Sequence, residues 1–149
     1  MDRIESVGIL KPELLDLGLE WLIRSNSIYK IEIFNYIIEK GANPIRNYYI
    51  PIVISNDSQD ILSRMIELGI DINKQTSEGL PIDIAITFCK KSEIELLIES
   101  GADITHLYGK VNTFVYKGNG WMGGMGSRMM VRRYFEEKGI VIEYEDRRF

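Results

Sequence analysis

Apolar residues recur along the chain at intervals of three and four positions, which is the spacing of one face of a helix. The clearest stretch contains Ile28, Ile31, Phe34, Ile37 and Ile38. A helix is also expected from Glu13 to Arg24. Side chains with this spacing pack one side of each helix against another element, so the pattern predicts an all-α fold.

Four of these stretches end in similar sequences, Ile37 to Asn43, Met65 to Asp71, Leu97 to Asp103 and Tyr134 to Ile140. Their glycines are 28, 32 and 38 residues apart. A glycine after the last apolar turn supplies the left-handed residue that ends a helix, and the next apolar residue can pack back on it. The sequence therefore predicts repeats at approximately 13–44, 45–73, 74–104 and 105–142, within a single domain of residues 1–149.

A shorter apolar helix precedes two of these helix ends, and each is expected to open with a proline, Pro51 and Pro81. Between the two helices of the later unit, Ser92 and Glu95 have the spacing of a capping box. The predicted repeat is a helix, a turn, a second helix and a loop.

The segments Gly79 to Ala85 and Leu97 to Asp103 resemble the ankyrin repeat, which combines a Thr-Pro-Leu-His-x-Ala helix start with a Leu-Leu-x-x-Gly-Ala-Asp ending over about 33 residues. Leu80 and Asp83 stand in the Thr and His positions, so the hydrogen bonds typical of that family must be replaced or absent. The resemblance implies an ankyrin-type solenoid with a degenerate C-terminal repeat. A helical hairpin array of another type would keep the same core and differ in its loops.

In such an array the loop tips and first helices form a concave surface that is available for binding. The contact residues that the resemblance implies are Arg46, Asn47, Tyr48 and Tyr49 in the first loop, Lys74, Gln75, Thr76, Ser77 and Glu78 in the second loop, and Asp57, Asp83 and Thr87 on the inner helices. Tyr48 and Tyr49 have an equally good interpretation as packing residues under the first loop.

The charge is unevenly distributed along the 149 residues. Residues 1–105 carry 10 basic and 17 acidic side chains, whereas residues 106–149 carry 8 basic and 5 acidic ones. An acidic body argues against general nucleic-acid binding and suits a basic protein partner, although it also serves solubility. The one cysteine excludes an internal disulfide, and we found neither a secretory signal nor a long apolar run, so a cytoplasmic protein without membrane contact is expected.

Residues that could carry catalysis are scarce. His106 is the only histidine, and Cys89 is expected to be a small core residue in an apolar helix. Carboxylate neighbours such as Glu93 with Glu95, and Glu136 with Glu137, are expected on solvated helix faces. The sequence predicts no enzyme, no metal site, no cofactor and no small-molecule substrate.

A glycine-rich segment, Gly118 to Gly126, precedes an amphipathic helix expected from Met129 to Lys138. It contains a GxGxxG pattern, so a phosphate group could bind there with Arg128, Arg132 and Arg133 as anchors, but no strand or βαβ unit is expected around it. The alternatives are an unstructured insertion, a partner-binding site that uses Trp121 and Met122 with the following Arg128, or a loop in which Trp121 covers the open end of the stack.

These observations favour a non-enzymatic protein-interaction module. Within that class the leading hypothesis is a small inhibitor or immunity-type protein that captures one partner, for example a toxin. The alternatives are a nucleotide- or phosphate-binding protein that uses the Gly118 to Gly126 segment, and a viral or bacterial effector or adaptor that binds a host protein.

Overall fold

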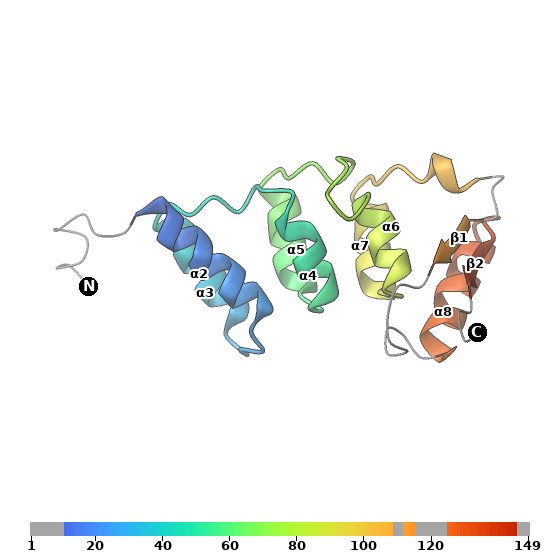
Figure 1. The fold of residues 1–149 in the computed structure, drawn as a ribbon, viewed down its shortest axis with the longest axis horizontal. Helices are drawn as coiled ribbons and strands as arrows, with labels where there is room; N and C mark the ends of the chain where they lie inside the picture. Colours follow the sequence, from blue (N-terminus) through green and yellow to red (C-terminus); the bar gives the residue numbers. More distant parts are fainter. Residues whose placement is uncertain (1–10, 109–111, 116–124, 146–149) are drawn as a thin grey trace. The chain divides into compact units, whose positions relative to one another are not determined.

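The computed structural model of the chain describes residues 11–108, 112–115 and 125–145 (Figure 1). Its contacts divide the chain into two compact units, one ending at Ile70 and the other starting at Asp71, where the sequence predicts one domain. The first unit contains helices α2 (Pro12–Arg24), α3 (Lys30–Glu39), α4 (Tyr49–Ser55) and α5 (Gln59–Glu67). The second contains α6 (Pro81–Thr87), α7 (Lys91–Glu99), a 3-10 turn (Thr105–Leu107), strand β1 (Asn112–Val115), α8 (Met125–Glu136) and strand β2 (Ile142–Glu145).

The first unit consists of two helix pairs, α2 with α3 and α4 with α5 (Figure 1). Helix α2 also packs on α4, and α3 packs on α5, so one core lies between the pairs. Its buried side chains include Leu19, Leu22, Ile23, Phe34, Ile50, Val53, Ile54, Ile61, Leu62 and Met65. The predicted apolar face of α3 is confirmed at Phe34, whereas Ile28 lies before the helix and is exposed.

The second unit pairs α6 with α7 and then departs from the helical pattern. Strands β1 and β2 run parallel, with Asn112 opposite Ile142 and Val115 opposite Glu145. Helix α8 lies between the strands in the sequence and packs on β2 and α7. The helical character predicted for the chain is confirmed, but these two strands correct the all-α prediction for the last segment.

Four helices end in the same geometry at the predicted glycines. Gly41, Gly69, Gly101 and Gly139 all have positive φ, between 76° and 105°. In each case the next residue donates its backbone N–H to the carbonyl five residues earlier, at 2.9–3.3 Å: Ala42 to Ile37, Ile70 to Met65, Ala102 to Leu97 and Ile140 to Phe135. This is the Schellman motif, and the donating residue is buried each time. The predicted helix stops are therefore confirmed.

The residue after three of these ends forms a further repeated bond. The side chains of Asn43, Asp71 and Asp103 accept a hydrogen bond from the backbone N–H two residues later, at 2.9–3.0 Å. Asn73 adds a link between successive loops, because its amide donates to the Gly101 carbonyl and accepts from the Asp103 N–H. Repeated side-chain bonds of this kind fix the loop after the helix without burying any side chain.

Several local predictions were wrong. Helix α4 begins at Tyr49 rather than Pro51, and the capping box is absent, because Ser92 lies inside α7 and the N-cap is Lys90. Cys89 is buried, as expected, but it lies beyond the end of α6 with a positive φ of 56°. Glu93 was expected to be solvated, yet it is buried, because it lies four residues before the core residue Leu97 and shares its helix face.

Replacing Gly41 by alanine tests the left-handed helix ends. Open space surrounds the position a Cβ would occupy, so the cost comes from the backbone alone and should be about 1–2 kcal/mol of unfolding free energy. Gly18→Ala in the interior of α2 is the matched control, and it should stabilise the protein by about 0.5–1 kcal/mol. Urea titrations followed by circular dichroism measure both values, and equal effects of the two substitutions would contradict the assignment.

Candidate functional site

The second loop is a tight turn that is closed by Thr76 and Gly79. Their backbone groups exchange two hydrogen bonds at 2.9 and 3.2 Å, and the Thr76 hydroxyl donates to the Gly79 carbonyl at 2.7 Å. Gly79 has a φ of +120°, which a residue with a side chain rarely adopts. Thr76 is buried, so it holds the loop together instead of offering a contact, and its prediction as an exposed contact residue of the loop tip is corrected.

The exposed residues of this turn face helix α6 across a groove of about 520 Å³. Gln75, Ser77 and Glu78 line it from the loop. Ile84 and Thr87 of α6, with Phe88 just beyond the helix, line it from the other side. Gln75, Ser77, Glu78 and Thr87 are all among the predicted contact residues, so the fold brings four of them to one groove, which Ile84 and Phe88 also line. Lys74 is exposed beside them.

Asp83 lies on the same helix and is held by two contacts. Its carboxylate oxygen is 2.7 Å from Nε2 of His106, which comes from the 3-10 turn, and its backbone carbonyl accepts a hydrogen bond from the Thr87 hydroxyl at 2.8 Å. His106 was not expected to contact a predicted site residue. Asp83 stands at the histidine position of the ankyrin pattern, so the hydrogen bond of that histidine had to be replaced or absent. In the structure the Asp83 carboxylate instead contacts the imidazole of His106 from the 3-10 turn.

The first loop, in the other unit, is fastened to α2. The Arg46 guanidinium lies 2.6 Å from the Asp16 carboxylate, and the Tyr49 hydroxyl donates to the Asp16 carbonyl at 3.2 Å. Tyr49 is fully buried, so its prediction as a contact residue is corrected, and the alternative as a packing residue is confirmed. Tyr48 is 46% exposed with its ring 4.3 Å from that of Tyr49, and Asn47 is half-buried. The surface that this loop exposes to a binding partner therefore includes Tyr48 and parts of Arg46 and Asn47.

The remaining predicted site residues belong to other segments of the sequence than these two loops. Asp57 follows the end of α4 at a φ of 52°, so it terminates the helix and does not stand on its inner face. Arg128 lies in α8 and is half-buried. Trp121 and Met122 lie outside the described residues, so the three interpretations of that loop stay predictions.

Burial of Tyr49 has a consequence for stability at high pH. Burial, with Tyr48 and Asp16 as additional causes, raises the pKa of its phenol well above the ordinary value of 10.0. In the unfolded chain the phenol ionises near pH 10, so the stability that neutral Tyr49 contributes is complete below that pH and is lost as the pH rises further. When the pH is raised from about 8 to about 10.5, the unfolding free energy of Tyr49→Phe should therefore fall by about 1 kcal/mol less than that of the parent chain.

Urea midpoints at the two pH values measure this difference. Tyr108→Phe is the control, since Tyr108 is exposed, and it should lose as much stability as the parent. If Tyr49→Phe and the parent chain responded identically to alkali, the phenol would not be held neutral by the fold.

Neither a metal site nor a membrane span is found in the described parts of the chain. Within them, no three or more His, Cys, Asp or Glu side chains are grouped in a way that could hold a metal ion. No helix there has both the length and the apolar character needed to cross a bilayer.

Comparisons of the chain with protein-family models, with curated proteins and with solved structures gave no match. What can be inferred about its function therefore comes from its own geometry.

Proposed function

We propose that the chain is a non-enzymatic protein-binding module built from ankyrin-type repeats. The observation that carries the proposal is the groove between the second loop and α6, which is lined by the polar residues Gln75, Ser77, Glu78 and Thr87 and by the apolar residues Ile84 and Phe88. Protein interfaces combine an apolar centre with a polar rim in this way. The identical helix ends and the side-chain bonds after them support the repeat assignment.

Two features support a basic partner. Glu78 is exposed at the tip of the groove, and residues 1–105 carry seven more acidic than basic side chains. An acidic surface speeds the encounter with a basic protein and disfavours acidic competitors. Within this class we favour a small inhibitor or immunity-type protein that masks one partner, such as a toxin, over a scaffold. The single buried thiol at Cys89 fits a cytoplasmic location.

Capture of the partner tests the class. The full chain is immobilised, incubated with extract of its native cell, and the retained protein is identified by mass spectrometry and titrated by calorimetry. Failure to retain any protein at micromolar concentration would count against protein binding. An activity assay of the retained protein then separates an inhibitor, which suppresses that activity, from an effector or adaptor, which leaves it unchanged.

The charge reversal Glu78→Arg tests the groove itself. Affinity for the captured partner should fall by at least about tenfold, because a charge that faces a basic surface becomes repulsive. Glu99→Arg is the matched control, since Glu99 is exposed at the end of α7 and does not line the groove. Equal affinities of the two variants would exclude this groove as the contact surface.

One observation favours a second candidate, a nucleotide- or phosphate-binding protein. The sequence interpretation excluded a βαβ context for the glycine-rich segment, and the structure corrects it, because β1, α8 and the parallel strand β2 span residues 112–145. The dinucleotide fingerprint also expects an acidic residue about 20 positions after the glycines, and Glu143 follows Gly123 by 20. The segment from Gly118 to Gly124 itself lies outside the described residues.

Thermal shift against a panel of nucleotides decides between the two candidates. A nucleotide at a hundredfold excess over its dissociation constant should stabilise the protein by about 2.7 kcal/mol. A flat panel would remove the second candidate and leave the protein-binding proposal untouched.

A further inference from the structure

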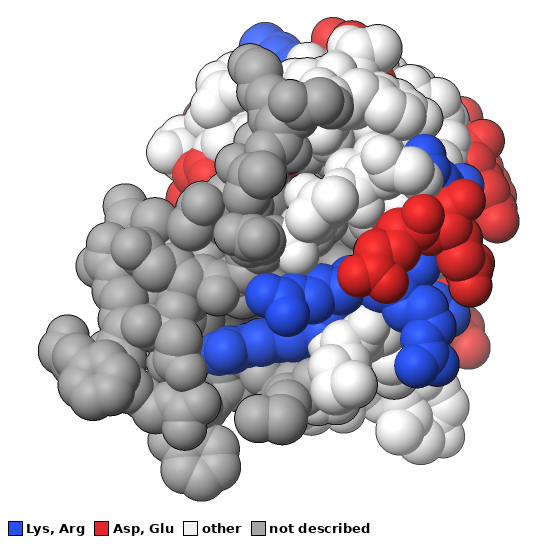
Figure 2. All heavy atoms as spheres, turned by 90° about the vertical axis from the view of Figure 1, so that its right-hand side faces the viewer, with Lys and Arg blue, Asp and Glu red and all other residues white. Residues whose placement is uncertain are grey.

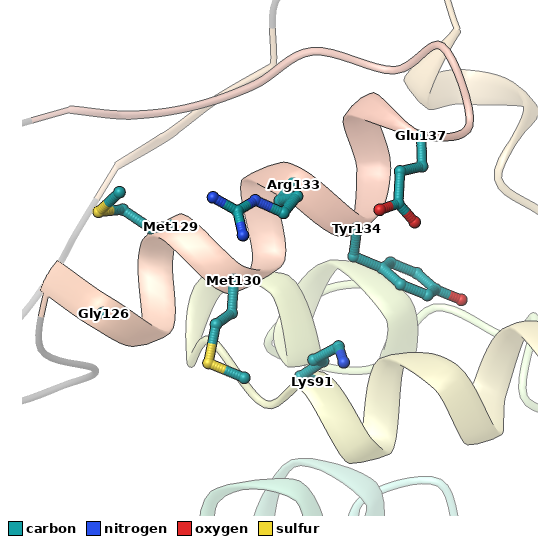
Figure 3. Close-up of a pocket in the computed structure, with 7 residues that line it drawn as sticks. All are labelled: Lys91, Gly126, Met129, Met130, Arg133, Tyr134 and Glu137. Atoms are coloured by element: carbon teal, nitrogen blue, oxygen red, sulfur yellow. The ribbon is translucent and has the colours of Figure 1, made fainter.

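A second groove, of about 470 Å³, lies along helix α8 in the same unit (Figure 3). Met129, Met130, Arg133, Tyr134 and Glu137 line it from α8 and the residue after it, and Lys91 lines it from the start of α7. Figure 3 shows the side chains of Met130, Tyr134 and Lys91 on the side of α8 that faces α7. None of these lining residues belongs to the groove between the second loop and α6.

The apolar side chains of α8 are only partly packed against the rest of its unit. Val131 and Phe135 are fully buried and account for the attachment of the helix to its unit. Met129 and Met130 are 56% and 55% exposed. Methionine is flexible and polarisable, so an exposed methionine pair adapts to apolar side chains of different shapes, and an apolar patch of this kind on a surface marks a contact site.

The charge around the groove is opposite to that of the rest of the chain. From its start to Lys138, the α8 segment carries Arg128, Arg132, Arg133 and Lys138 against Glu136 and Glu137. Figure 2 shows basic side chains gathered in a band beside exposed uncharged ones, with acidic side chains at its edge. The Lys138 ammonium lies 5.1 Å from the centre of the Tyr134 ring, and Lys91 pairs with Glu95 at 3.1 Å. An occupant of this groove therefore meets methionine and tyrosine side chains together with the cationic groups of Lys91 and Arg133.

We infer that this groove binds a short acidic segment of another protein, whose apolar side chains pack on Met129 and Met130 and whose carboxylates lie next to Arg133 and Lys91. A hollow of this size takes a few side chains, whereas a lipid surface needs a convex or flat contact. A nucleic acid needs a longer row of cations than Lys91 and Arg133, the two basic residues that line the groove. The inference is independent of the proposed function, because it concerns another groove and a partner of the opposite charge.

A peptide selection on the intact chain tests the inference and does not require the natural partner to be identified first. A phage library of random peptides of about 12 residues is selected on the immobilised protein and counter-selected on the double variant Met130→Glu, Arg133→Glu. The enriched peptides are expected to carry net negative charge together with large apolar residues. Enrichment of neutral or basic peptides, or no enrichment over the counter-selected protein, would overturn the inference.

Fluorescence anisotropy with one enriched peptide then locates the contact. Met130→Glu and Arg133→Glu should each weaken binding by at least about tenfold, and binding should weaken between about 50 mM and about 300 mM salt. Lys74→Glu is the control, because it makes the same charge change as Arg133→Glu on the exposed second loop of the same unit and should leave the affinity unchanged. Equal affinities of all three variants would overturn the inference.

Two further measurements keep the result decisive. Far-UV circular dichroism checks that each variant keeps its helices, and Arg133→Gln replaces any variant that does not, with the expected loss then at least about threefold. Tighter binding to phosphatidylcholine vesicles with about 30% phosphatidylserine, or to polyuridylic acid, than to any enriched peptide would assign the groove to a lipid surface or to RNA and overturn the inference.

Discussion

Replacing Phe34 by alanine is expected to lower the free energy of unfolding of the first unit by about 3–5 kcal/mol. Phe34 is fully buried, whereas its neighbours Ile33 and Asn35 retain exposed surface. Removing the ring takes away its transfer free energy and leaves a cavity that the helices α2 and α5, both packed on α3, can only partly close. Most small domains have a total stability of about 5–15 kcal/mol, so this single change should leave the unit marginal.

Urea denaturation of Phe34→Ala measures the loss, and Ile33→Ala is the control. Ile33 is on the same helix but is 39% exposed, so its truncation should cost at most about 1 kcal/mol. Hydrogen exchange resolved by residue shows in addition whether the residues after Asp71 lose protection together with those before it. Losses of the same size for Phe34→Ala and Ile33→Ala would contradict the core described for this unit.

Replacing Lys30 by methionine is expected to cost about 2–3 kcal/mol. The Lys30 ammonium donates to the Ile23 carbonyl at 2.9 Å and to the Ser58 hydroxyl at 3.0 Å, and Ser58 is buried. These charge-assisted bonds join the end of α2 to the turn between α4 and α5. Methionine keeps the approximate length of the side chain and removes both bonds. The expected loss of unfolding free energy comes from the Ile23 carbonyl and the Ser58 hydroxyl, which lose this donor.

Thermal and urea unfolding of Lys30→Met measure this effect against Lys11→Met. Lys11 is exposed at the start of α2, and removing its charge should change stability by no more than about 0.5 kcal/mol. Ser58→Ala should show roughly half of the Lys30→Met loss, because it removes one of the two bonds. If Lys30→Met left the unfolding free energy unchanged, the Lys30 ammonium would be hydrated in the folded chain and the two bonds would not contribute to stability.

The helix ends could be predicted because the interactions that make them are local. The glycine that adopts positive φ, the buried residue after it and the carbonyl that receives its N–H all lie within six positions, as at Gly101 and Ala102. Composition and spacing alone identify such a segment. For the same reason Pro81 was correctly placed at the start of α6, where its missing N–H costs nothing.

The strands β1 and β2 could not be predicted in this way. Each has four residues, and each pairs with a partner 30 positions away, as Asn112 with Ile142. A short strand acquires its hydrogen bonds from a segment that periodicity within its own sequence does not reveal. The burial of Glu93 was missed for a related reason. A charged residue is expected to be exposed, but Glu93 lies on the same face of α7 as the core residue Leu97 and is buried with it.

The candidate site was partly predictable. The polar residues of the second loop were recognised because a polar segment between two apolar helices is expected at a surface, and three of them do line the groove. Thr76 was misassigned and Tyr49 was left open between binding and packing, since only the folded chain shows that Thr76 closes a turn and Tyr49 fills a core. Most of the α8 groove was missed, although the adjacent pair Met129 and Met130 beside arginines was a visible signal.

The repeated helix end also bears on how far such a chain can drift in sequence while keeping its shape. Each end depends on one glycine, one small or aliphatic residue after it and backbone groups that every amino acid supplies. The positions between the ends need only remain apolar on one face, a condition that many residues satisfy. Neighbouring helix ends can thus share one geometry while having only the glycine and a small or aliphatic residue after it in common. Related chains of this kind would lose detectable sequence similarity long before their backbones diverged.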